Sequence, residues 1–301
     1  MILLRIEYRD LDIVALVRGN MPKNDWTTVI EPNSGLFDLR LKEIYKYRDL
    51  LWLFVKRDIV VVYKQTILGP LWYIIQPILT TLMFTFIFGR IAKIPTDGIP
   101  HIVFYLCGVT VWNYFSECLT LTSNTFVANQ KIFGKVYFPR VLVPLSILIS
   151  NLIKFAIQFC IFLIVWFFYL YKGEITPNWE LLFLLPVVII IMGGTSLGFG
   201  MLFSSMTATY RDLTFLLKFG VQLWMYGTPV IYSLSTMPDN YKFYIELNPI
   251  TYLIETVRSI FLGGDGYRFE GLLYSSVFSV VILFVGFVVF SKIERKFMDT
   301  V

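Results

Sequence analysis

Two charged residues, Glu117 and Lys154, lie inside long stretches that are otherwise apolar or uncharged. A charge in such surroundings is costly, and intramembrane charges usually face protein or water. The chemistry open to them is pairing, because a carboxylate and an ammonium stabilise each other. The connection between their two stretches is short, so we expect the two side chains to form an ion pair. The alternative is that each side chain extends to the nearest polar surface.

Residues for catalysis or metal binding do not gather in the sequence. No Gly-x-x-x-x-Gly-Lys-Ser/Thr phosphate loop is present, which excludes nucleotide hydrolysis by that route. The single histidine and the three cysteines do not stand at metal-ligand spacing. We therefore expect no catalytic residues, no metal site and no cofactor held by this chain.

The composition is that of a membrane protein. A soluble domain has about a quarter of its residues charged, whereas this chain of 301 residues is 16% charged and 56% hydrophobic, with a mean hydropathy of +0.68. Spanning the hydrocarbon core takes about 20 apolar residues. We predict an all-α integral membrane protein with six transmembrane helices at 71–88, 101–121, 142–170, 181–203, 215–232 and 272–290. They form one domain, 47–301, after an N-terminal extension, 1–46.

The basic residues predict the orientation of these spans. Eighteen of the 26 Lys and Arg residues lie on the side of the two termini, six lie on the other side and two lie within spans. Short cytoplasmic segments carry an excess of Lys and Arg. We expect a multi-pass membrane protein with both termini in the cytoplasm.

A basic amphipathic helix is predicted at 50–64, before the first span. Apolar residues recur there at steps of three and four, with polar positions between them. Such a helix lies in the membrane interface. It is either an anchor in the membrane lipid or a movable collar at the inner mouth of a pathway. The residues that we assign to it are Trp52, Arg57, Tyr63 and Lys64.

A second short helix is predicted at 128–138, between the second and third spans. Its basic residues are not balanced by any acidic residue, and Pro139 ends it. The charges can simply follow the positive-inside preference. A helix that also exposes Phe133 and Tyr137 is typical of a surface that docks a partner. The residues of this candidate docking surface are Asn129, Lys131, Ile132, Phe133, Lys135, Val136 and Tyr137.

A third short helix is predicted at 249–262. Asn248 suits the N-cap, Pro249 suits the first helical position, and glycines follow the end. Fourteen residues are too few to span, so we expect a re-entrant helix or a helix lying at the outer face. Glu255 and Arg258 stand three apart and can pair. This helix is either a lid without a gating role or a gate.

Several stretches together resemble the polysaccharide-exporting branch of ABC transporter permeases. They are, in order, "FVKRDIVVVYKQTILGPLWYIIQP", "QKIFGKVYFPR", "TATYRDL", "YGTPVIY" and "LNPITYLIETVRSIFLGG". The resemblance covers nearly the whole chain except its first 26 residues, which fit the family pattern poorly.

The resemblance implies the assembly and the roles of the short helices. Two copies of the chain form the pore, and two copies of a separate ATPase subunit bind ATP and magnesium. The segment 128–138 matches the family's coupling helix, 50–64 its interface or gate helix, and 249–262 its outward gate helix. The substrate is a polysaccharide such as O-antigen, capsule or a teichoic-acid-like polymer, and no nucleic acid is involved.

Other classes stay open from the sequence. One is an ABC exporter of lipids, drugs or ions with the same architecture. Another is an ion-driven carrier, or a membrane-bound glycan enzyme. The carboxylates of the outward connections are spread along the sequence rather than paired, which argues against the enzyme. A carrier driven by ions usually needs carboxylates near the midplane, where Glu117 is the one candidate.

Overall fold

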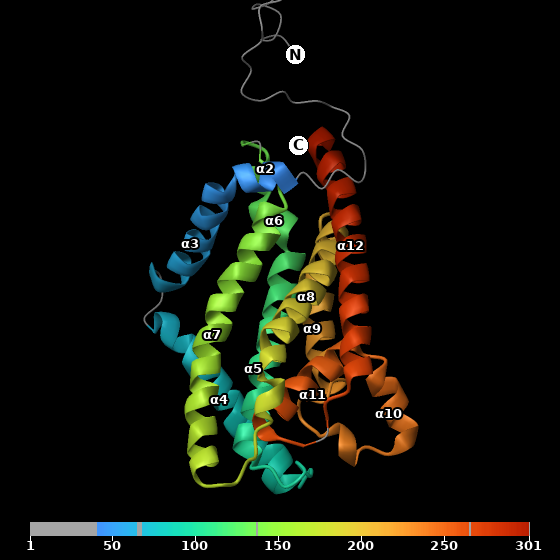
Figure 1. Ribbon diagram of the computed structural model, residues 1–301. Coiled ribbons are helices and arrows are strands. Elements are labelled where there is room, and N and C mark those ends of the chain that lie inside the picture. The colour runs from blue at the N-terminus through green and yellow to red at the C-terminus, as the bar shows by residue number, and fades with distance from the viewer. Residues whose placement is uncertain (1–40, 65–67, 137, 265, 301) are drawn as a thin grey trace, which may run out of the picture. The chain divides into compact units, whose positions relative to one another are not determined.

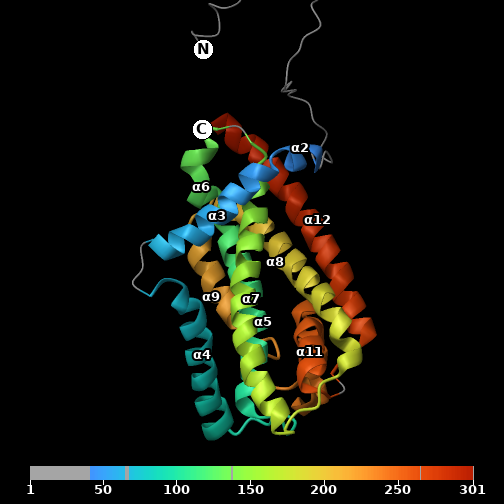
Figure 2. The same cartoon turned by 60° about the vertical axis from the view of Figure 1, so that its left-hand side comes forward.

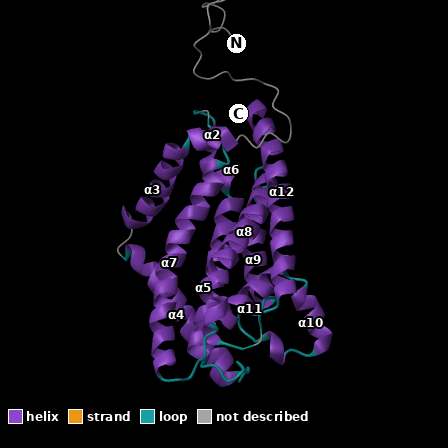
Figure 3. Ribbon diagram, viewed as in Figure 1, coloured by secondary structure: helices purple, strands orange, loops and turns teal. Residues whose placement is uncertain are grey.

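The protein is described from a computed structural model that covers residues 41–64, 68–136, 138–264 and 266–300. Within these ranges the chain forms helices joined by loops and no strands, as Figure 3 shows. The predicted all-α membrane architecture is confirmed. The boundary predicted after residue 46 stays a prediction, because most of the extension lies outside the described residues.

The elements follow one another along the chain as a series of long helices with shorter ones between them. They are α2 (Leu41–Lys46), α3 (Arg48–Lys64), η1 (Gly69–Leu71), α4 (Trp72–Phe84), the π-helical η2 (Thr85–Ile91), α5 (His101–Ser123), α6 (Thr125–Phe133), α7 (Leu142–Tyr171), η3 (Trp179–Leu184), α8 (Leu185–Thr207), α9 (Leu213–Tyr226), η4 (Leu234–Thr236), α10 (Asp239–Glu246), α11 (Pro249–Leu262) and α12 (Phe269–Thr300).

Five helical segments in the described residues are long and apolar enough to cross a membrane. They are Trp72–Ile91, His101–Ser123, Leu142–Tyr171, Trp179–Thr207 and Phe269–Glu294. These correspond to five of the six predicted spans.

The remaining prediction, a single helix over 215–232, is wrong in its extent. Helix α9 has 14 residues and ends at Tyr226, after which the chain turns at Gly227. At 1.5 Å per residue, α9 is about 21 Å long, shorter than the hydrocarbon core. The glycine and proline of "YGTPVIY" mark the place where this helix stops.

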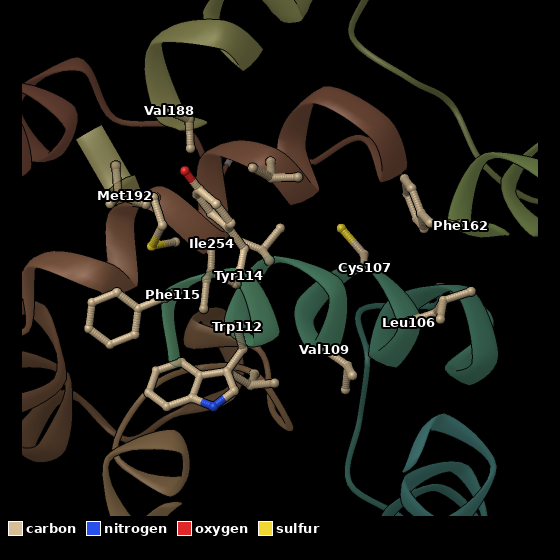
Figure 4. Close-up of a cluster of buried hydrophobic side chains, with 14 of the residues drawn as sticks. Leu106, Cys107, Val109, Trp112, Tyr114, Phe115, Phe162, Val188, Met192 and Ile254 are labelled. Carbon is tan, nitrogen blue, oxygen red and sulfur yellow. The ribbon is translucent and has the colours of Figure 1, made fainter. Parts of the chain in front are cut away.

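Helix α5 forms the centre of the bundle. In the most apolar stretch of α5, 78% of the residues are buried. The corresponding share for α4 with η2 is 11%, so most of that segment faces outward. Side chains of α5 meet side chains of α7, α8 and α11, as Figure 4 shows. The labelled residues of this core are Leu106, Cys107, Val109, Trp112, Tyr114, Phe115, Phe162, Val188, Met192 and Ile254.

Helices α8 and α12 pack with their backbones in contact, and glycines allow this. A Cβ atom added at Gly286 would lie 2.2 Å from the carbonyl oxygen of Gly198, which no side chain tolerates. Small residues permit such close approach where lipid removes the hydrophobic drive for helix association. The pair therefore forms a rigid wall of the bundle.

The short helices gather at two opposite ends of the bundle, visible in Figure 1 and again in the turned view of Figure 2. We call one the α6 end, formed by α2, α6 and the last turns of α12. We call the other the α11 end, formed by α10, α11 and the loops beside them. Helix α3 extends from the α6 end along α7.

Candidate functional site

The predicted docking helix is present as α6, with shifted bounds. It starts at Thr125 instead of Ala128 and ends at Phe133, where Gly134 forms the C-cap. It starts earlier because α5 ends at Ser123 and only Asn124 separates the two helices. The remainder of the predicted segment forms a turn that leads to Pro139.

The exposed part of this segment is basic. Lys131, Lys135 and Val136 are exposed, and the side chain of Val136 is 58% accessible. Ile132 is half-buried. Tyr137 lies outside the described residues, so its predicted exposure stays a prediction. The exposed basic tip therefore consists of Lys131, Lys135 and Val136.

The expectation that Phe133 is exposed is wrong. Only 3% of this residue is accessible, and its ring packs against those of Phe126 and Phe138. Its direct ring partners are near in sequence, but the cluster that buries them together is assembled from distant segments. The cluster also contains Phe54 of α3 and Phe290 of α12. Phe133 therefore anchors α6 to this aromatic cluster.

Asn129 is also buried, and it connects α6 with α3. Its side-chain amide donates to the carbonyl of Thr125 at 2.9 Å, and its oxygen accepts from Arg57 Nη1 at 3.5 Å. Arg57 in turn pairs with Asp58 at 2.8 Å. The hydroxyl of Ser146 in α7 donates to Asp58 at 3.4 Å. These polar contacts join α3, α6 and α7.

Arg140, which follows the docking segment, was missed as a site residue. Its backbone N–H donates to Glu294 Oε1 and its Nη1 donates to the Glu294 carbonyl, both at 3.2 Å. The guanidinium also lies 4.9 Å from the ring centroid of Phe133. Burial lowers the pKa of Arg140, and the carboxylate of Glu294 opposes this shift. Its basic charge was visible in the sequence, but its partner is 154 residues away.

Helix α3 presents two different faces. Phe54 and Val55 are buried, and Phe54 packs against Phe138 at the α6 end. Trp52 is 60% accessible on the outer face, and Lys64 is exposed. Tyr63 belongs to α3, but its side chain lies outside the described part of the chain. The predicted amphipathic pattern therefore corresponds to one face against protein and one face that the other described residues do not cover.

The predicted pairing of Glu117 with Lys154 is confirmed. Lys154 Nζ lies 3.2 Å from Glu117 Oε2, between α5 and α7. The ammonium also lies 5.2 Å from the ring centroid of Tyr73 in α4. One helical turn away, Asn113 donates to Gln158 at 3.5 Å. The two helices thus share a polar strip inside the span.

The helix predicted at 249–262 is confirmed as α11, with the expected caps. The Asn248 side chain accepts from the N–H of Ile250 at 3.1 Å, and Pro249 occupies the first turn. Gly263 follows the helix with φ of 84°, a left-handed conformation that favours glycine. Residues at the two ends of the helix were therefore enough to predict where it begins and ends.

Helix α11 is surrounded by other parts of the protein. Every residue of α11 except Tyr252 is buried. Arg258 pairs with Glu255 at 3.0 Å, and their side chains are 4% and 8% accessible. Burial raises the pKa of Glu255, and the guanidinium of Arg258 opposes this. The predicted ion pair is therefore confirmed, whereas the choice between a re-entrant helix and a helix at the outer face of the membrane stays a prediction.

Arg258 also fastens α11 to its neighbours. It donates to the carbonyls of Val230 at 2.7 Å and Tyr232 at 3.2 Å. Its guanidinium lies 3.8 Å from the ring centroid of Phe104 in α5. One side chain therefore connects α11, the segment after α9, and the central helix.

The described residues contain no group of three or more His, Cys, Asp or Glu side chains that could hold a metal ion. The charged pairs identified above lie in separate parts of the bundle.

The sequence of this chain is similar to a known protein family and to several characterised transport proteins. The model of the ABC-2 type transporter family matches residues 49–262. The chain is 27% identical over 252 residues to the O-antigen export system permease protein RfbA of Klebsiella pneumoniae, covering 83% of this chain and 94% of that protein. It is 27% identical over 264 residues to the protein of the same name from Myxococcus xanthus, with 87% and 98% covered. It is 27% identical over 236 residues to the polysialic acid transport protein KpsM of Escherichia coli, with 77% and 89% covered.

Proposed function

This chain belongs to the ABC-2 type transporter family, and from that premise we propose that it is the transmembrane subunit of an ATP-driven polysaccharide exporter. The observation that carries the proposal is the similarity, over most of both chains, to transport proteins from three organisms. The names of these proteins specify O-antigen export or polysialic acid transport. The substrate would be an O-antigen, a capsule or a teichoic-acid-like polymer, carried on a lipid.

We propose that the α6 end lies in the cytoplasm and that the α11 end faces outward. The excess of Lys and Arg on the side of the termini supports this orientation. The membrane would be the bacterial cytoplasmic membrane, crossed several times. Helix α9 together with the segment 227–232 would complete a sixth crossing.

The exposed basic tip of Lys131, Lys135 and Val136 would dock on a separate ATPase subunit, and ABC-2 permeases normally work with such a partner. The functional unit would contain two copies of this chain and two of the ATPase. ATP and magnesium would be bound by the ATPase, and this chain itself would not be an enzyme. In this proposal, the buried side chains of Phe133 and Asn129 fix the position of the helix that carries the docking surface.

Helix α3 would lie in the inner membrane interface. Its exposed Trp52 and Lys64 are residue types that favour the boundary between lipid and water. Because polar contacts connect α3 with α6, a displacement of the docked helix would reach α3 directly. The same displacement would have to reach α11, whose burial in the outward end fits an outward gate.

Deletion of the gene in its host tests the proposal. We expect surface polysaccharide, measured by gel electrophoresis of cell extracts, to disappear while lipid-linked polymer accumulates in the cytoplasmic membrane. A plasmid copy of the gene should restore the surface polymer. An unchanged amount of surface polymer in the deletion strain would refute polysaccharide export.

The partner is tested by purifying the tagged chain in mild detergent and identifying what accompanies it. An ATPase subunit with a phosphate loop, present in equal copy number, is the expected result. Export that continues when the neighbouring ATPase gene is deleted would contradict the proposed drive.

A further inference from the structure

A cavity of about 490 Å³ opens at the α11 end. Its wall comes from segments that are far apart in sequence: 97–99, 173–176, 233–235 and 262–264, together with Gly266, Arg268 and α11 itself. Small-molecule sites typically have volumes of about 300–1,000 Å³. The cavity is therefore large enough for an organic ligand, and nothing in the proposed coupling mechanism uses it.

The charged residues of the wall are compensated. Asp97 accepts hydrogen bonds from the hydroxyls of Ser233 and Ser235. Lys242 pairs with Asp239 at 3.0 Å, and Arg268 pairs with Glu246 at 2.8 Å. The remaining charged residues of the wall, Glu174, Glu255 and Arg258, also have opposite charges within 4 Å. Such a wall does not favour a strongly charged ligand of either sign.

Hydrogen-bonding capacity nevertheless remains in the wall. The Nε of Arg258 is buried and has no hydrogen-bond partner among the described residues. Oε2 of Glu255 lies beside Gly266, where an added Cβ atom would be 2.8 Å from that oxygen, so a larger residue at 266 would press on the pair. The unpartnered donor therefore belongs to the buried pair that lines the cavity, and the serine hydroxyls of the wall add further donors and acceptors.

We propose that this cavity binds a short neutral saccharide segment of the exported polymer on the outward side of the membrane. Hydroxyl groups both donate and accept, so they match a wall that combines guanidinium, carboxylate and serine groups without net charge. The inference rests on the proposed function, because polysaccharide export brings sugar hydroxyls to this end. Binding there would hold the leaving polymer beside the outward gate and oppose its return.

Filling the cavity tests its use in export. Thr176 is exposed on the cavity rim, so Thr176→Trp places a large ring there without removing a buried contact. Asn240→Trp is the matched control, because Asn240 is exposed at the same end but does not line the cavity. We expect surface polymer to fall several-fold in the Thr176 variant and to stay unchanged in the control, at equal amounts of chain in the membrane.

Binding is tested on the complete exporter in lipid nanodiscs. In a Cys160→Ala background, where the other two cysteines are buried, Thr176→Cys is labelled with a fluorescent maleimide. The probes are oligosaccharides released from the host's own surface polymer and, separately, inorganic phosphate. We expect the oligosaccharides to slow labelling at position 176 several-fold, but not labelling of Asn240→Cys. Protection by phosphate alone would overturn the saccharide assignment, and no protection by either probe would overturn the site.

These tests separate the two proposals. If deletion of the gene abolishes surface polymer but Thr176→Trp exports normally and position 176 is not protected, only the cavity proposal fails. If deletion leaves the surface polymer unchanged, polysaccharide export fails whatever the labelling shows.

Discussion

Each end of the bundle contains a buried arginine that lies over a phenylalanine ring and donates to backbone carbonyls, but the two are used differently. Arg258 has its carboxylate partner three residues away on the same helix, so the pair moves with α11 and fastens it to neighbours through carbonyl groups. Arg140 has its partner in α12, 154 residues away. The first arginine fixes one helix in place, whereas the second connects α12 with the segment that follows the candidate docking surface.

The α11 end should be the more sensitive to loss of its arginine. Arg258→Met leaves the carboxylate of Glu255 buried without its cation, and such a change costs about 3–5 kcal/mol. We expect the variant to be strongly destabilised when unfolding is followed in detergent. Adding Glu255→Gln to Arg258→Met should recover part of the loss, and no recovery would contradict the pairing as its cause.

The pH dependence of Arg258→Met supplies a second check. Burial already raises the pKa of Glu255, and removing the guanidinium removes the influence that lowers it. The folded state then binds a proton more tightly than the unfolded chain, so stability is greatest at low pH and is lost as pH rises through the folded-state pKa. The Arg258→Met/Glu255→Gln double variant should lack this dependence.

The aromatic cluster at the α6 end predicts the next largest effect. Phe133→Ala empties a buried site, and Phe→Ala substitutions in cores cost about 3–5 kcal/mol. We expect faster proteolysis of the segment around α6 and loss of export. Val136→Ala, on the exposed basic tip, is the control and should change stability by less than about 0.5 kcal/mol. Equal proteolysis of the two variants would contradict the supporting role of Phe133.

These two ends also show what a sequence can and cannot predict. The bounds of α11 follow from Asn248, Pro249 and Gly263, which act within a few residues of one another. The cluster that buries Phe133 also contains Phe54 and Phe290, which come from the two ends of the described chain. No local pattern contains that information, so a buried aromatic residue was predicted to be an exposed contact.

The same distinction applies to charges. Glu117 and Lys154 belong to consecutive spans whose short connection makes them neighbours, and their pairing was predictable. Arg140 and Glu294 meet only because α12 returns to the α6 end, which depends on the packing of the whole bundle. The predicted span over 215–232 rested on its apolar composition. The helix itself ends before Gly227 and Pro229, two residues that interrupt helices.

Arg140→Gln should affect export more than folding. It removes the charge-assisted hydrogen bond that Nη1 donates to the Glu294 carbonyl in α12, worth about 1.5–3 kcal/mol. We expect the ATPase still to co-purify and hydrolyse ATP while surface polymer falls strongly. Arg140→Lys should rescue export in part, because its ammonium can still reach the Glu294 carbonyl. Export in proportion to the amount of folded chain in both variants would mean that Arg140 only stabilises the fold.

The intramembrane pair should give a smaller effect that can be measured by a double-mutant cycle. Contacting residues typically show coupling energies of about 0.5–3 kcal/mol. We expect Glu117→Gln and Lys154→Met to be coupled near the lower part of that range, because both side chains are partly accessible. Independent effects of the two substitutions would show that the contact contributes nothing to stability.

The exposed basic tip predicts the smallest effect on stability and the clearest effect on the partner. Lys131→Glu with Lys135→Glu replaces two exposed charges that the rest of the described chain does not bury, so stability should change by less than about 0.5 kcal/mol. If this tip docks on the ATPase, reversing both charges should reduce the amount of ATPase that co-purifies and lower export with it. Lys93→Glu, an exposed lysine outside both the basic tip and the cavity wall, is the matched control and should leave both unchanged. Normal co-purification of the ATPase with the reversed tip would place the docking surface elsewhere, and the buried contacts of Phe133 and Arg140 would then stabilise only the fold of the α6 end.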